Sequence, residues 1–159
     1  MASSDAANLA EALVRNRAVT ERMAAVAARS DDLVRIVHDN WTVAAKLAHL
    51  AYWDRFVLIL LDRWQRRLPF RTDPPQWFDD VQNDAILDES LALEPAVAAR
   101  LAVEAARAVD EWHAGLSAED AARLDADARQ SETDANWLVH RYRHREEHLD
   151  EVDAASASG

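Results

Sequence analysis

The stretch TVAAKLAHLAYWDRFVLILLDRW, residues 42–64, determines the expected fold. When its residues are placed at 100° intervals around a helix, the apolar side chains gather on one stripe. That stripe contains Ala45, Tyr52, Trp53, Phe56, Val57, Leu60, Leu61 and Trp64. Thr42 is suited to cap the first turn, and the helix is expected to continue to about Arg67. A helix with one apolar face must bury that face against other helices.

Three further segments have the pattern of amphipathic helices, over residues 4–29, 95–115 and 133–153. In the first, polar Asn16 and Thr20 interrupt a stripe formed by Leu9, Leu13, Met23, Ala24 and Ala27. The segment over residues 95–115 begins at Pro95, a residue suited to a first turn. Its expected stripe is Val97, Leu101, Ala105, Ala108 and Trp112. Four amphipathic helices around one core predict an all-α four-helix bundle.

The connections between these helices differ in character. Residues 30–41 are expected to tuck their apolar side chains under the bundle. A long irregular connection over residues 68–77 separates the second and third helices, because a helix cannot pass through its Pro-Pro pair; a short helical piece is expected around 78–87. Residues 117–133 look polar and turn-like, with at most a single capped turn. One domain over residues 1–153 and a disordered tail over 154–159 are expected.

Composition limits the chemistry that the chain can perform. Among 159 residues there is no cysteine, which excludes disulfides, thiolate metal sites and cysteine nucleophiles. Imidazole and carboxylate groups would therefore have to hold any metal ion. A thiol taking part in a reaction would have to arrive as a small molecule.

Charge and hydropathy limit the partners and the location. The net charge of −11 argues against binding to nucleic acid and to anionic membrane surfaces. The N-terminal residues lack the basic start and apolar run of a signal peptide, and the longest apolar stretch, residues 56–61, is too short to cross a bilayer. A cytoplasmic protein is expected.

Three of the six histidines stand out by their helical positions. His49 lies inside the apolar stripe of its helix, where an imidazole must be hydrogen-bonded or ligated. His144 and His148 are four residues apart, so they face the same way on the flank of the last apolar stripe. His140 lies furthest from that stripe, and His38 and His113 carry no comparable signal. The alternatives are a hydrogen-bonded core histidine at 49 and a solvated pair at 144 and 148.

Taken together, the three positions indicate a metal site. Helical bundles build such sites from inward side chains on facing helices. Three neutral imidazoles without a charged ligand suit Zn²⁺, with Ni²⁺ or Fe²⁺ as alternatives, and leave positions for water or substrate.

The motifs also carry a family resemblance. WTVAAKLAHLAYWDR (residues 41–55), followed by HREEHLDEV (residues 144–152), resembles the DinB-like superfamily, and WFDDVQNDAIL (residues 77–87) is similar to its inter-helix segment. The resemblance implies a four-helix bundle, often dimeric, with a divalent metal on His49, His144 and His148. Relatives of this kind include the mycothiol-dependent maleylpyruvate isomerase and the bacillithiol S-transferase, which use the metal to activate a low-molecular-weight thiol.

Three functions follow as hypotheses. The favoured one is a metal-dependent, thiol-using S-transferase or isomerase acting on a small electrophile, with Arg141 or Arg145 at the mouth to hold an acidic cosubstrate. The second is a metal-dependent hydrolase, with Asp54 or Asp84 as general base. The third is a non-catalytic, stress-related metal-binding or dimerisation module. An enzyme is favoured over a non-enzyme.

Overall fold

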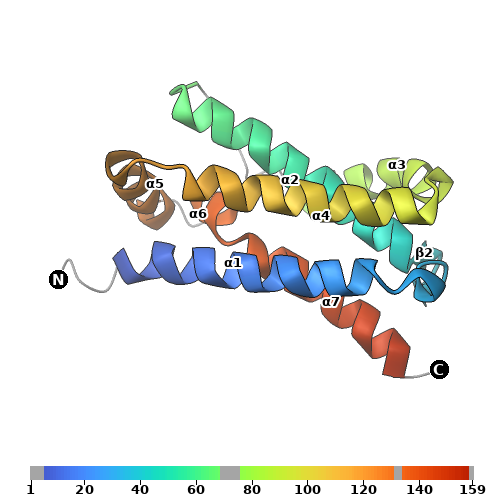
Figure 1. The fold of residues 1–159 in the computed structure, drawn as a ribbon. Coiled ribbons are helices and arrows are strands. Elements are labelled where there is room, and N and C mark those ends of the chain that lie inside the picture. The colour runs from blue at the N-terminus through green and yellow to red at the C-terminus, as the bar shows by residue number, and fades with distance from the viewer. Residues whose placement is uncertain (1–5, 69–75, 131–133, 158–159) are drawn as a thin grey trace.

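The computed structural model describes residues 6–68, 76–130 and 134–157. Within these ranges the chain is mostly helical, as expected, with one small two-stranded sheet (Figure 1). The elements are α1 (Ala6–Ala27), the 3₁₀ turn η1 (Ser30–Asp32), β1 (Ile36–His38), β2 (Trp41–Thr42), α2 (Val43–Gln65), α3 (Gln76–Ala92), α4 (Pro95–Ala114), α5 (Ala118–Gln130), α6 (Asp134–Val139) and α7 (Arg141–Ala157).

Four long helices enclose the core. The most extensive contact is between α2 and α4, and α1 packs against both α4 and α7. Figure 1 shows α1 and α4 running side by side in opposite directions, with α7 crossing behind α1. Helix α3 packs against α2, while α5 and α6 pack together at the other end. This arrangement brings α2 and α7, which carry the candidate histidines, into contact.

The helix starts confirm Thr42 as a cap and Pro95 as a first-turn residue, and they add a cap at Glu94 that was not expected. The Thr42 hydroxyl accepts a hydrogen bond from the Ala45 backbone nitrogen at 3.1 Å and so caps α2. At the start of α4, Pro95 stands in the first turn and the Glu94 carboxylate accepts from the Val97 nitrogen at 2.9 Å. Local sequence therefore sets where these two helices begin.

The core face of α4 is rotated from the expected stripe. Val97, Leu101, Ala108 and Trp112 are only half-buried, and the face that packs against α2 consists of small residues. These residues are Ala98, Ala99, Ala102, Ala105, Ala106 and Val109. Alanines allow two helices to approach closely, because no long side chain separates their backbones. Of the expected stripe only Ala105 is fully buried, while Leu101 and Trp112 are partly buried at the edge of the core. The stripe was misplaced because it was drawn through Val97, Leu101 and Trp112 rather than through the alanines beside them.

The connections contain more regular structure than expected. Residues 36–42 form an antiparallel hairpin, β1 with β2, whose turn places Asp39 in the left-handed region at φ 46°. The expected short helical piece around 78–87 is part of the 17-residue α3.

Two expectations near the C-terminus were also wrong. Residues 118–130, expected to be turn-like, form the 13-residue α5, capped by the Ser117 hydroxyl, which accepts from the Asp120 nitrogen at 3.0 Å. The last helix is broken at His140 into α6 and α7. Helix α7 then continues to Ala157, into the stretch expected to be a disordered tail. The Pro-Pro pair of the long connection lies outside the described residues.

None of the helices in the described part of the chain combines the length and hydropathy that a membrane span requires.

Candidate metal centre

Helices α2 and α7 bring three imidazole rings to one point. The Nε2 atom of His144 lies 3.2 Å from Nε2 of His49 and 3.2 Å from Nε2 of His148. One nitrogen from each ring falls within a group no wider than 4.8 Å. In a tetrahedral zinc site with Zn–N bonds of about 2.05 Å, ligand nitrogens are about 3.3 Å apart. The spacing of these rings therefore fits a single metal ion.

Burial keeps the three imidazoles neutral. His49 is 3 % exposed, and burial lowers its pKa to about 3. Burial is also the largest cause lowering the pKa of His144 well below its ordinary value, and the nearby Arg141 adds to this effect. The pKa of His148 is lowered by burial as well, although a hydrogen bond to Glu151 acts in the opposite direction. A neutral imidazole retains the lone pair that a metal needs.

His148 has the partner that orients a metal-binding histidine. Its Nδ1 lies 3.0 Å from Oε2 of Glu151. The same oxygen forms an ion pair with Nζ of Lys46 at 2.8 Å. Partial burial raises the pKa of Glu151, but hydrogen bonds from Lys46 and His148 outweigh it and the pKa is lowered overall. A carboxylate on Nδ1 holds the proton there, which directs the Nε2 lone pair into the cluster.

His144 has a different partner on its outer nitrogen. Arg141 donates from Nη2 to Nδ1 of His144 at 3.0 Å. Because a guanidinium can only donate, Nδ1 must accept, and the proton of a neutral His144 then lies on Nε2. That proton points to Nε2 of His49 and of His148, both within hydrogen-bonding distance. Metal binding would require His144 to release or move this proton.

Two arginines are completely buried beneath the histidines. Arg141 and Arg145 both have 0 % side-chain exposure, and each donates from Nε to one oxygen of Asp54, at 3.0 and 2.9 Å. Arg145 also pairs with Asp110 at 3.3 Å. Two arginines and two aspartates balance in charge, which is what allows them to be buried. The expectation that Arg141 and Arg145 line the mouth was wrong.

The polar residues that interrupt the α1 stripe belong to this network. Thr20 accepts from Nη1 of Arg145 at 2.9 Å and donates to Asp110 at 2.6 Å. The side-chain oxygen of Asn16 accepts from the Tyr142 backbone nitrogen at 2.7 Å. Both side chains are buried, so their place in the core is explained by hydrogen bonding rather than by apolar packing.

Aromatic rings enclose His49. Trp41 meets it edge-on with ring centroids 5.6 Å apart, and Trp53 lies at 6.3 Å on the other side. Trp53 also approaches His144, with centroids 6.3 Å apart, and its indole nitrogen donates to Asn83 of α3 at 3.3 Å. Trp41 of the hairpin and Trp53 of α2 thus place apolar surface beside His49, and Asn83 of α3 holds the Trp53 ring by its hydrogen bond.

The remaining histidines do not join the cluster. His140, expected at the rim, is buried with 6 % exposure at the break between α6 and α7. His113, expected to be solvated or locally bonded, is also buried in the core. Its ring nitrogens lack hydrogen bonds of good geometry, and burial lowers its pKa to about 4 although the backbone at Val109 and Leu138 acts in the opposite direction. The exposed His38 lies near Glu151, at 3.7 Å.

Sequence reasoning brought together His49, His144 and His148, and the structure places all three in contact. It missed the Lys46–Glu151 pair and the role of Asp54. Lys46 is the one lysine in a chain with 17 arginines, and Glu151 stands three residues after His148 on one helix. Both facts were available signals. The pairing of Asp54 with residues about ninety positions later had no local signal.

Comparisons with family models, with curated proteins and with solved structures each find no match to this chain.

Proposed function

We propose that the chain binds one divalent metal ion, with zinc as the first expectation, through His49, His144 and His148. The convergence of three neutral Nε2 atoms within one small group carries this proposal. Three protein ligands leave a coordination position for another molecule, which is the pattern of catalytic rather than structural sites. Nickel and iron are the alternatives that imidazole ligands also accept.

We further propose that the function is thiol-dependent transfer or isomerisation of a small electrophile. A bound cation would supply stabilisation of a thiolate near neutral pH. In this proposal the packing of α1, α2, α4 and α7 is a DinB-like four-helix bundle, and the partners are a low-molecular-weight thiol and a small-molecule substrate. A cytoplasmic location and a homodimer belong to the same proposal. The absence of cysteine supports an external sulfur source.

The chain's own residues have separate roles in this proposal. Glu151, held by Lys46, keeps the His148 proton on Nδ1 and so keeps Nε2 available. Trp41 and Trp53 exclude water beside His49. Asp54 forms ion pairs with both buried arginines and has no exposed surface. It is therefore not free to act as a general base. This disfavours the hydrolase that would use Asp54.

Metal content tests the first step. Purified protein is equilibrated with zinc, desalted and analysed by plasma mass spectrometry, next to the His49→Ala, His144→Ala and His148→Ala variants. We expect about one ion per chain in the wild type and a large loss in each variant. His38→Ala is the control for an exposed histidine that is not one of the three ligands; its link to the cluster is the contact with Glu151, at 3.7 Å, so at most a small loss is expected. Equal metal content in the wild type and His49→Ala would refute the site.

Thiol dependence tests the reaction class. The zinc-loaded protein is incubated with an electrophile such as 1-chloro-2,4-dinitrobenzene in the presence of mycothiol, bacillithiol or glutathione. We expect thioether formation above the uncatalysed rate with at least one thiol, lost in His148→Ala. Turnover of an ester substrate without any thiol would instead indicate the hydrolase. A zinc-loaded protein inactive in both assays, whose melting temperature falls strongly with chelator, would indicate a structural metal.

A further inference from the structure

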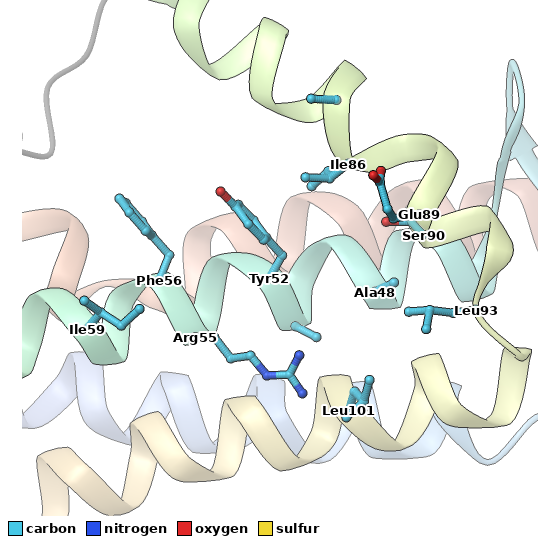
Figure 2. Close-up of a pocket in the computed structure, with 12 residues that line it drawn as sticks. Ala48, Tyr52, Arg55, Phe56, Ile59, Ile86, Glu89, Ser90, Leu93 and Leu101 are labelled. Carbon is cyan, nitrogen blue, oxygen red and sulfur yellow. The ribbon is translucent and has the colours of Figure 1, made fainter.

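A groove of about 580 Å³ lies between α2, α3 and α4, outside the histidine cluster (Figure 2). No histidine lines it. The lining residues are Ala48, Ala51, Tyr52, Arg55, Phe56, Ile59, Ala85, Ile86, Glu89, Ser90, Leu93 and Leu101. Small-molecule sites have volumes of about 300–1,000 Å³ and combine apolar walls with few polar groups. We propose that this groove binds an apolar small molecule with one acid group, which pairs with Arg55.

The walls of the groove are mainly apolar. Phe56 and Ile59 lie toward one end and Leu93 and Leu101 toward the other, with Tyr52 between them on α2 (Figure 2). Ile59 remains 60 % exposed, and with the neighbouring apolar side chains of the wall it offers a continuous apolar surface. An apolar ligand body lying along the groove would cover it and gain the free energy of burying apolar surface.

Arg55 supplies the charge that selects an acid. Its side chain reaches from α2 toward α4 and Leu101 (Figure 2), and it forms no ion pair or hydrogen bond with another described residue. Several other exposed arginines have carboxylate partners, such as Arg100 with Glu104 at 3.0 Å, although Arg143 is another without one among the described residues. A guanidinium that has no partner among the described residues and lies beside an apolar wall can offer paired donors to a carboxylate or sulfonate.

The remaining polar groups define the orientation. Glu89 and Ser90 come from α3, across the groove from Arg55 (Figure 2), so the carboxylate of Glu89 repels an acid on that side. The hydroxyl of Tyr52 already accepts a hydrogen bond from Gln82 at 3.1 Å, which ties α3 to α2. The acid group is therefore directed to the α4 side, and the apolar body lies between α2 and α3.

The groove is separate from the histidine cluster. Tyr52 and Phe56 pack against the Trp53 ring, with centroids 5.3 and 5.7 Å away, and Trp53 in turn packs against His49. One aromatic ring thus stands between the groove and the imidazoles. Ligand binding in the groove does not require a metal, so the proposal is independent of the metal site.

Metal-free protein, prepared with chelator, tests the proposal. Anilinonaphthalene sulfonate, an aromatic sulfonate with strong fluorescence in apolar surroundings, is titrated at low ionic strength, and bound probe is then displaced by decanoate or by decyltrimethylammonium. We expect saturable binding of one probe per chain and displacement by decanoate at about tenfold lower concentration than by the cation of equal chain length. Equal potency of the two detergents would refute recognition of an acid.

Variants locate the binding. Arg55→Glu should weaken decanoate binding about tenfold, while Arg107→Glu, the same charge change on the exposed side of α4, should leave it nearly unchanged. Glu89→Gln should maintain or strengthen it. Ala85→Phe, at an exposed α3 position that faces the groove, should block binding by filling the space. Circular dichroism verifies that each variant is folded. Trp77 lies on the exposed face of α3. If Trp77→Ala loses probe binding while Ala85→Phe still binds the probe, the probe binds elsewhere and the proposal is overturned.

Discussion

Arg141 donates a hydrogen bond to Nδ1 of His144 at 3.0 Å, so a buried cation occupies the outer nitrogen of one of the three convergent rings. Its Nη1 atom, also buried, has no hydrogen-bond partner in the part of the chain that the structure describes. The other side of the guanidinium is held by Asp54 at 3.0 Å. This contact favours the His144 tautomer with the proton on Nε2, and in that tautomer Nε2 has no free lone pair to offer a metal ion in the cluster.

Replacing this arginine should therefore strengthen metal binding. In Arg141→Met, Nδ1 of His144 is free to carry the proton, and Nε2 presents its lone pair to the ion. We expect zinc affinity, measured by competition with a chromophoric chelator, to rise about tenfold. Arg143→Met is the matched control, because Arg143 is exposed and contacts Tyr142 instead of a histidine. Weaker zinc binding in Arg141→Met would mean that the arginine positions His144 rather than opposing the metal.

The carboxylate behind His148 should have the opposite effect. Glu151→Ala removes the acceptor that holds the His148 proton on Nδ1, so the ring can change tautomer and rotate. We expect zinc affinity to fall about 10–100-fold, the usual cost of losing such a partner. Glu147→Ala changes an exposed carboxylate on the same helix and should have little effect. Equal affinities of the two variants would contradict the role given to Glu151.

The ion pairs of Asp54 should dominate the response of stability to mutation. Asp54→Ala leaves Arg141 and Arg145 buried without their shared carboxylate. We expect the free energy of unfolding in urea to fall by about 3–5 kcal/mol. Asp62→Ala, which removes an exposed pair with Arg66 on the same helix, should cost less than about 1 kcal/mol. A small loss in Asp54→Ala would show that water or another group replaces the carboxylate.

His113 should make the protein sensitive to acid. Its pKa is about 4 in the folded chain, whereas a solvated histidine, as in the unfolded chain, has a pKa of 6.5. The unfolded chain therefore takes up the proton first as the pH falls. Stability from this residue is therefore present above pH 6.5 and is lost between pH 6.5 and 4. Each pH unit between 6.5 and 4 lowers the free energy of unfolding by up to about 1.36 kcal/mol. At pH 5 the loss of stability from this residue therefore amounts to about 2 kcal/mol.

His113→Leu should remove that part of the acid sensitivity. The ring nitrogens of His113 have no hydrogen bonds of good geometry to lose, so a leucine of similar size should be tolerated. Urea unfolding at pH 7.5 and pH 5 measures the difference, and the variant should gain more at pH 5. His38→Leu, at an exposed position, serves as control. A parallel pH dependence of the wild type and His113→Leu would disprove this assignment.

Features that depend on one helix were predictable. The cap at Thr42 and the first-turn Pro95 are local, and the stripe around His49 and the spacing of His144 and His148 follow from helical periodicity. Apart from the meeting of His49 with His144 and His148, features that depend on the packing of two helices were not predicted. The core face of α4 was misplaced because alanine contributes little to an apolar stripe, although it packs closely against α2. That error also led to the expectation that His113 was solvated or locally bonded.

Polar residues in helix interiors caused the other errors. Asn16 and Thr20 looked like interruptions of a core stripe, and Arg141 and Arg145 looked like surface residues near an opening. Each is buried and bonded to a partner in the core. That partner comes from a distant part of the chain, so the local pattern does not reveal it. Periodicity treats all polar residues as outward-facing, so a buried network of balanced charges is invisible to it.

The arrangement of Asp54 constrains how this sequence can vary. His49 and Asp54 are five residues apart on α2, and their partners Arg141, His144 and Arg145 alternate along α7. Inserting one residue between His49 and Asp54 would turn them by about 100° relative to each other, so one of the two sets of partners would be lost. In descendants of this chain, that interval should keep its length, and replacement of Asp54 by an apolar residue should be accompanied by loss of both arginines.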